Sequence, residues 1–282
     1  MKWREYENKI HEYVANHYIN SKILYNQTVS GKMSGSNRQI DMLIDESIAG
    51  RHYRIVIDYS TFRDNRIDVR DVEMFLGTLA DCDAQKGILI TAKGFTQEAM
   101  NRAQFDENKE IEVDLLNIDD LKELTGSNAI IYKEDCGAII TTPFGWIIDK
   151  ANDHLYFLAA FYKRGIELLT AVKNKEWICA SIEVKSPTTK SLKDFLACQE
   201  EYTKKEMPDA VTNYEKRKID KDKSITFREI SHKEFDHREI TGFVEFDEFI
   251  FYAVLITSKS LYEKNFRKLE FILDKVLPLN MK

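Results

Sequence analysis

The stretch GKMSGSNRQIDMLI, residues 31–44, joins a glycine- and serine-rich loop to an apolar strand that carries an aspartate. Glycine and serine favour a loop because both are common in turns. In the strand that follows, alternate side chains share a face, so we expect Gln39 and Asp41 on one face and Ile40, Met42 and Ile44 on the other. A carboxylate between apolar neighbours is costly to bury without a partner, which makes Asp41 a candidate functional residue.

A second strand with an embedded aspartate follows. Residues 53–59 read YRIVIDY, and a glycine turn before them predicts a hairpin with the first strand. Asp58 and Ser60 should share a face of this second strand. Asp41 and Asp58 on adjacent strands could then share one Mg²⁺, which binds one or two carboxylates together with water and substrate phosphate. In the alternative interpretation, the two aspartates only pair with nearby basic side chains and hold the hairpin together: Arg38, Arg54 or Arg63.

The segments around the hairpin predict an α/β domain with a mixed sheet flanked by helices. Apolar residues recur at helical spacing over 3–18 and 68–82, and Thr96 is a candidate cap for a further helix. Residues 86–91 form a short apolar strand of the kind that is covered on both faces. Further strands are expected at 23–29 and 111–116, and a short helix is expected to end near Gly126.

The pattern changes after Gly126, so we expect two domains, residues 1–126 and residues 127–282. Strand-like runs at 138–141, 177–184, 224–230 and 240–257, with helical runs at 190–206 and 259–276, predict an α+β domain with a mostly antiparallel sheet. The charged segment 208–223 is expected to be a flexible loop. Residues 145–149 and 249–255 faintly resemble small α+β domains of the PsbP type, a resemblance that implies no reaction.

Four segments of the first half resemble the Mrr-like restriction endonucleases of the PD-(D/E)xK superfamily over about residues 3–125. The family implies a central mixed sheet flanked by helices, Mg²⁺-dependent phosphodiester cleavage and DNA as the substrate. The segments, in chain order, are Gly31-x-x-Ser34-Gly35-x-x-Arg38-Gln39-Ile40-Asp41, Val69-x-Asp71-Val72-x-x-Phe75-x-Gly77, Ala84-x-Lys86-Gly87-Ile88-Leu89-Ile90-Thr91 and Gly94-Phe95-Thr96-x-x-Ala99.

The chain departs from this family at the second strand of the hairpin, where Asp58-Tyr59-Ser60 stands in place of Glu-x-Lys. Asp58 keeps a metal ligand, but Ser60 cannot supply the positive charge of the lysine. Lys86 matches an ordinary family position and is expected at a solvated strand end. The resemblance implies a site made of Asp41 as the first metal ligand, Asp58, Ser60, Gln39 beside Asp41, and Glu7 as the acidic residue that borders the site.

Composition limits the remaining choices. The formal net charge is -6 and the pI is near 5.7, so any surface that grips nucleic acid must be local. Four cysteines without a C-x-x-C pair predict free thiols in a reducing cytosol. The N-terminal residues lack a signal core, and no run is long enough to span a membrane, so we expect a soluble cytoplasmic protein.

Two further patterns in the second half receive structural interpretations. Glu183-Val184-Lys185 repeats the Glu-x-Lys spacing, but no aspartate-bearing hairpin strand precedes it, so a salt-bridging strand is expected. His232 and His237 are five residues apart, which fits no known ligand motif and favours a solvated loop.

Three functions follow from these observations. The first is an active or weakly active metal-dependent DNA endonuclease in DNA restriction or defence. The second is a catalytically degenerate nuclease fold, a pseudoenzyme that binds DNA or a protein partner. The third is a sensor or assembly protein whose second domain, through a protein partner, carries the main function. Each of the three functions is compatible with an oligomer, and the sequence does not predict the oligomeric state.

Overall fold

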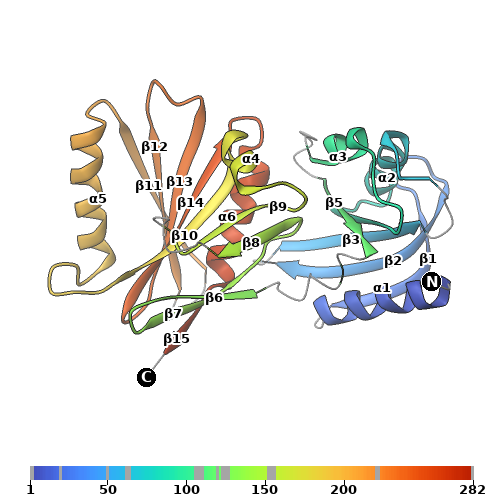
Figure 1. The fold of residues 1–282 in the computed structure, drawn as a ribbon, viewed down its shortest axis with the longest axis horizontal. Helices are drawn as coiled ribbons and strands as arrows, with labels where there is room; N and C mark the ends of the chain where they lie inside the picture. Colours follow the sequence, from blue (N-terminus) through green and yellow to red (C-terminus); the bar gives the residue numbers. More distant parts are fainter. Residues whose placement is uncertain are drawn as a thin grey trace. The chain divides into compact units, whose positions relative to one another are not determined.

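The computed structural model describes residues 3–18, 21–48, 51–60, 65–104, 111–118, 121, 128–150, 157–219 and 223–280. The chain divides into two compact units, Met1–Ser127 and Asn128–Lys282 (Figure 1). The boundary expected from the sequence, after residue 126, lies beside this division. No described helix is long and apolar enough to cross a membrane.

The first unit is the predicted mixed sheet with helices. Its strands run in the order β1-β2-β3-β4-β5, with antiparallel pairs from β1 to β3 and parallel pairs from β3 to β5. Its elements are α1 (Trp3–His17), β1 (Lys22–Ser30), β2 (Asn37–Ile48), β3 (Arg51–Ser60), α2 (Val69–Asp81), β4 (Lys86–Thr91), α3 (Gln97–Gln104) and β5 (Glu112–Asn117).

Local sequence signals explain why α2 and α3 begin where they do. The Asp68 side chain accepts hydrogen bonds from the first turn of α2, and the Asp71 side chain accepts the Asp68 amide, which is a capping box. Thr96 accepts a hydrogen bond from the Ala99 amide at the start of α3. The apolar stripe of α2 then packs on β4, where Gly87 leaves room for Phe75 and other α2 side chains.

The second unit contains a seven-stranded antiparallel sheet in the order β11-β12-β13-β14-β10-β9-β8, and a three-stranded sheet in the order β15-β7-β6. These strands confirm the predicted mostly antiparallel architecture. The elements are β6 (Asn128–Lys133), β7 (Cys136–Thr141), β8 (Trp146–Lys150), β9 (Ala159–Lys163), α4 (Leu168–Lys173), β10 (Glu176–Val184), α5 (Leu192–Glu206), β11 (Val211–Lys218), β12 (Ser224–Ser231), β13 (His237–Glu245), β14 (Phe249–Ser258), α6 (Tyr262–Lys275) and β15 (Leu277–Asn280).

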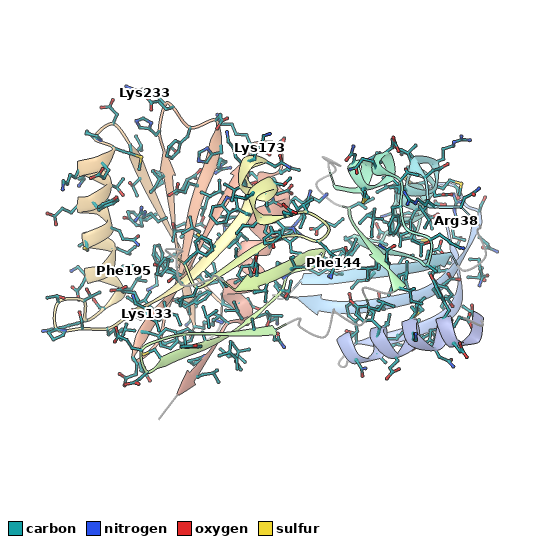
Figure 2. All side chains as sticks on the ribbon, in the orientation of Figure 1. Arg38, Lys133, Phe144, Lys173, Phe195 and Lys233 are labelled. Carbon is teal, nitrogen blue, oxygen red and sulfur yellow. The ribbon has the colours of Figure 1, made fainter. Side chains whose placement is uncertain are left out.

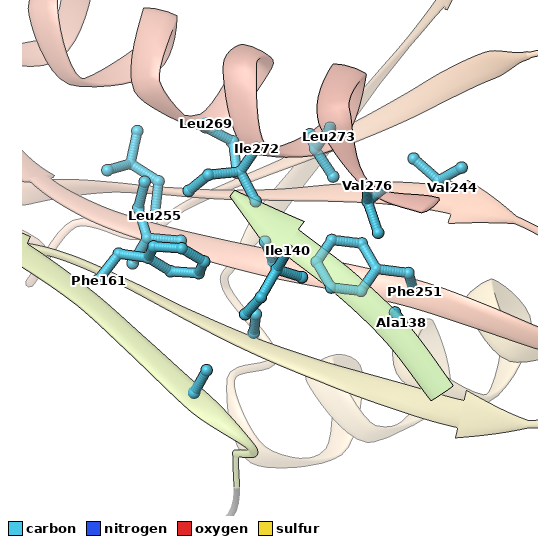
Figure 3. Close-up of a cluster of buried hydrophobic side chains, with 14 of the residues drawn as sticks. Ala138, Ile140, Phe161, Val244, Phe251, Leu255, Leu269, Ile272, Leu273 and Val276 are labelled. Carbon is cyan, nitrogen blue, oxygen red and sulfur yellow. The ribbon is translucent and has the colours of Figure 1, made fainter. Parts of the chain in front are cut away.

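The main core of the second unit lies between α6 and one face of this larger sheet. Leu269, Ile272 and Leu273 of α6 pack with Phe251 and other buried side chains of the strands (Figure 3). Gly242 makes the close approach of α6 possible, because a Cβ there would lie 2.1 Å from the Leu273 side chain. The packing of α6 against the sheet therefore depends on the missing side chain at Gly242.

Two expectations for longer segments of the second half are wrong. The segment 208–223, expected as a flexible loop, contains β11, whose polar side chains are mostly exposed because it is the edge strand. The run 240–257, expected as one strand, is two strands, β13 and β14, joined where the Phe246 amide bonds the Phe249 carbonyl. The sequence reasoning also did not predict β6, β8, β9, β15 and α4, which are short.

The salt-bridging interpretation of Glu183-Val184-Lys185 is consistent with the contacts, whereas the solvated loop expected for His232 and His237 is not, because His237 begins β13. Glu183 pairs with Lys133 at 3.2 Å and Lys185 pairs with Glu245 at 2.9 Å, so both charges of the Glu-x-Lys repeat are used in ion pairs. The rings of His232 and His237 both contact Phe235, with centroids 5.6 and 4.7 Å away. These histidines thus flank an aromatic ring rather than converge on an ion.

Candidate functional site

The glycine- and serine-rich loop before Asp41 is organised by one carboxylate, that of Asp81 at the end of α2. Asp81 is 3% exposed and accepts hydrogen bonds from the amides of Met33 and Ser34 and from the Ser34 hydroxyl. Arg38 Nε donates to the same carboxylate at 2.7 Å (Arg38 is labelled in Figure 2). The bonds from Ser34 and then from Arg38 hold the pKa of Asp81 well below its ordinary value, so it is ionised at neutral pH.

The two glycines of the loop follow from this arrangement. A Cβ on Gly31 would lie 2.3 Å from the Asp81 carboxylate, which only a shift of that anchor could relieve. Gly35 has a φ of 67°, in the left-handed region that side chains rarely adopt. The motif of residues 31–38 is thus a loop that wraps around Asp81 and fixes the start of β2.

Asp41 lies at an interruption of the strand ladders on both sides of β2. The register of β1 and β2 passes from Tyr25–Met42 to Gln27–Ile40, and Asn26, which has a φ of 49°, does not pair with Asp41. On the other side, the register of β2 and β3 ends at Met42–Ile57. The Asp41 carboxylate instead accepts the Tyr59 amide at 3.0 Å. Asp41 therefore reaches the main chain of β3 directly after Asp58.

The same interruption breaks the alternation of β2. Ile40 and Leu43 are three positions apart, yet both belong to the buried cluster beneath α2 and α3. Strict alternation would place them on opposite faces, so the strand rotates about its axis near Asp41. The expectation that Ile40, Met42 and Ile44 share one face is therefore wrong. Gln39, expected beside Asp41, is exposed and its side chain accepts the Thr28 hydroxyl at 3.2 Å.

Glu7 reaches this region through Tyr59, a residue that the sequence reasoning missed. The Tyr59 hydroxyl donates to Glu7 Oε1 at 3.1 Å, across from β3 to α1. Burial raises the pKa of Tyr59, and the negative charges of Asp41, Glu7 and Asp58 raise it further. Glu7 thus contacts the phenol of Tyr59, whereas Asp41 bonds the main-chain amide of the same residue. The only sequence signal for Tyr59 was its place in the middle of Asp58-Tyr59-Ser60. Strand alternation predicts its side chain on the face opposite Asp58.

Asp58 is exposed at the end of β3, and the main chain of Ser60 pairs with Thr91 of β4. The side chain of Ser60 lies outside the described residues, and so does Arg63. Arg38 is engaged by Asp81, and Arg54 lies 3.4 Å from Asp45. The alternative in which Arg38 or Arg54 pairs with Asp41 is therefore not the arrangement that the contacts show.

Lys86 does not lie at a solvated strand end. It is 8% exposed, and its Nζ lies 4.5 Å from the centre of the Tyr53 ring. Lys86 pairs with Ile55 in the parallel ladder, four positions before Tyr59 along β3. That expectation is wrong because the apolar stem of the lysine is covered, and its ammonium group finds an aromatic face.

The residues present fit a divalent cation that completes its shell with other ligands. Among the described residues, no three His, Cys, Asp or Glu side chains group closely enough to form a metal cage of their own. Mg²⁺ does not require one, because it keeps waters and takes oxygens from substrate phosphate. The Tyr59 amide donates to Asp41 Oδ2 and so holds this carboxylate beside the end of β3. Asp41, Asp58 and Glu7 all offer the hard oxygen ligands that this ion prefers.

Comparison with known proteins gives one family match. Residues 1–125 match the family Mrr_cat, described as restriction endonuclease. No curated protein matches the chain. Among solved structures, a protein of unknown function designated AF1548 is 14% identical with a TM-score of 0.34, over 44% of this chain and 67% of that one. The PsbP protein CyanoP from Synechocystis sp. PCC 6803 is 12% identical with a TM-score of 0.37, over 54% of this chain and 93% of that one.

Proposed function

From the Mrr-like restriction endonuclease domain that residues 1–125 form, we propose that this chain is a metal-dependent DNA endonuclease with an altered active site. The observation that carries the proposal is the position of Asp41. Its carboxylate bonds the amide that directly follows Asp58, at the position where the β1–β2 ladder skips one pair and the β2–β3 ladder has ended. We further propose that the enzyme acts in DNA restriction or defence within the cytoplasm.

Asp41 and Asp58 would hold Mg²⁺, and Glu7 would border it. When bound, the cation would neutralise the charge that develops on the phosphodiester and lower the pKa of a bound water. The protein itself supplies the placement of the carboxylates. The Asp81 anchor fixes the start of β2, and the Tyr59 amide fixes the side chain of Asp41. Hydrolysis then adds water across a phosphorus–oxygen bond of the DNA backbone.

Ser60 stands where the family has lysine, and this substitution sets the expected rate. A hydroxyl can donate and accept hydrogen bonds, but it carries no charge to offset the transition state. A preorganised electrostatic group of this kind is typically worth about 10²–10³-fold in rate. The proposal is therefore of a slow nuclease rather than of a fast one.

A cleavage assay tests the proposal. Purified protein is incubated with plasmid DNA, unmodified and with modified bases, in Mg²⁺ or Mn²⁺, beside Asp41→Ala and a matched control, Asp45→Ala. Asp45 lies on the same strand and pairs with Arg54, away from the Tyr59 amide. We expect cleavage by the wild type and Asp45→Ala and none by Asp41→Ala. Cleavage that survives Asp41→Ala, or none on any DNA tested, would contradict the proposal.

A degenerate nuclease fold that binds DNA or a protein is the second candidate, and Ser60 favours it, because a lysine at this position takes part directly in the family's chemistry. A separate observation favours a protein partner of the second unit, namely an exposed apolar face on its three-stranded sheet. Ile130 and Leu277 are 48% and 56% exposed, and both pair with Ile139 between them. A protein partner would cover such a face, and the cleavage assay separates this candidate from the first.

A further inference from the structure

We propose that Tyr59 is a positioning residue that holds Glu7 of α1 and Asp41 of β2 in one cluster, through its hydroxyl and its amide respectively. This inference rests on the proposed metal-dependent function and adds a residue to its site. Tyr59 positions the carboxylates with two neutral hydrogen-bond donors, a role that a lysine would fill in part with its positive charge.

The geometry assigns both bonds to the same residue. The amide of Tyr59 donates to Asp41 Oδ2 at 3.0 Å, and the hydroxyl donates to Glu7 Oε1 at 3.1 Å. Three elements, α1, β2 and β3, are therefore joined at one residue, through its amide and its hydroxyl. A phenol has an ordinary pKa near 10 and stays a donor at neutral pH, so the link to Glu7 does not depend on the state of a second acid.

The ring of Tyr59 is itself held in place. The imidazole of His11, one turn along α1 from Glu7, meets the Tyr59 ring edge at a centroid distance of 6.5 Å. His11 also contacts Tyr25 of β1 at 4.6 Å. These rings limit where the phenol can point, so the hydroxyl returns to the same oxygen of Glu7. A side chain held in this way positions its partner with less loss of rotamer freedom at the moment of binding.

The hydrogen bond between the Tyr59 hydroxyl and Glu7 matters because three carboxylates are involved. Glu7, Asp41 and Asp58 all lie near enough to Tyr59 for their charges to raise its pKa, and a flexible Glu7 would turn into water without a donor to hold it. The Tyr59 hydroxyl is such a donor for Glu7, and a bond to a carboxylate from an O–H group is charge-assisted. Glu7 is thereby kept where its charge adds to the attraction for a cation at Asp41 and Asp58.

A double-mutant cycle on Mn²⁺ binding tests the inference without relying on DNA cleavage. Calorimetry on the full chain measures the Mn²⁺ dissociation constant of the wild type, Tyr59→Phe, Glu7→Gln and the double variant. Groups that orient metal ligands are typically worth about 10–100-fold in metal affinity. We expect Tyr59→Phe to weaken binding by about 10-fold when Glu7 is present, and to change nothing in the Glu7→Gln background. Tyr53→Phe, on the same strand beneath Lys86, is the matched control and should leave affinity unchanged.

The outcomes separate this inference from the function on which it rests. Equal losses from Tyr59→Phe in both backgrounds would show a general structural role and overturn it. Binding that Asp41→Ala abolishes and Tyr59→Phe leaves intact would overturn the inference but keep the metal site. A wild type that binds no Mn²⁺ would overturn both. Thermal unfolding of each variant shows that the compared proteins are folded.

Discussion

Arg38 Nε donates to Asp81 Oδ2 at 2.7 Å, and this ion pair joins the segment three residues before Asp41 to the C-terminal end of α2. The side chain of Asp81 is buried, with 4% exposed, and that of Arg38 is 39% exposed. Because the same carboxylate also accepts the Met33 and Ser34 amides, it links the loop, the strand and the helix. The position of Asp41 therefore depends on a residue that lies on another element.

Asp81→Asn should destabilise the first unit in a pH-dependent way. The folded pKa of Asp81 is depressed, chiefly by Ser34 and Arg38, so its stabilising contribution is present above the unfolded value near 4 and is lost as the pH falls through the folded value. The difference in unfolding free energy between wild type and variant should be largest at neutral pH and shrink below about pH 4. Urea unfolding at pH 7 and pH 3 measures it. Asp83→Asn, exposed and paired only with Lys32 at the surface, is the control.

Two glycine substitutions, one in the loop and one in α2, should change the stability of the first unit in opposite directions. Gly31→Ala puts a methyl group 2.3 Å from the Asp81 carboxylate, and overpacking of this kind typically costs about 1–3 kcal/mol. Gly77 lies inside α2 with open space around it, so Gly77→Ala should stabilise by about 0.5–1 kcal/mol. Chemical denaturation of both variants gives the two free energies. The same sign for the two substitutions would contradict the role assigned to Gly31.

Ser60→Lys should raise the rate if the wild type cuts DNA. A lysine there can hold the attacking water and offset transition-state charge, a contribution that is typically about 10²–10³-fold. Asp58→Glu together with Ser60→Lys restores the family motif more fully, and the two neighbouring changes should couple. Cleavage rates of the single and double variants, with metal binding as a check, measure the effect. A double variant that folds, binds metal and cuts no DNA would show that the loss lies beyond these two positions.

The four cysteines should differ in reactivity. Cys198 is exposed on α5, whereas Cys82 and Cys136 are buried. Cys179 is half-buried, but burial raises its pKa to about 12, so its thiolate is scarce at pH 8. We expect one thiol of the native protein to react rapidly with a disulfide reagent at pH 8. Cys198→Ser should remove that fast phase, and a fast phase that persists would contradict the assignment.

Much of the first unit could be predicted because its signals are local. The helix expected over 68–82, the cap at Thr96 and the apolar run 86–91 depend on neighbours within a turn or a strand, and each lies where the sequence placed it within a residue or two. β11 could not be predicted in this way. Its side chains are polar on both faces because an edge strand needs no apolar face, so the chain there reads as a loop.

The sequence by itself determined the order of elements in the first unit, the loop before Asp41 and the departure at Asp58-Tyr59-Ser60, since each depends on residue type and short spacing. Only the tertiary structure decided what these features contact. Asp81 holds Ser34 from 47 positions away, and Tyr59 meets Glu7 from 52 positions away. The rotation of β2 at Asp41 is likewise set by the strands on either side. The periodicity of the sequence contains no information about these neighbours. Hydrogen bonds act over about 3 Å in space, so the partners of a carboxylate are fixed by the folding of distant segments onto it.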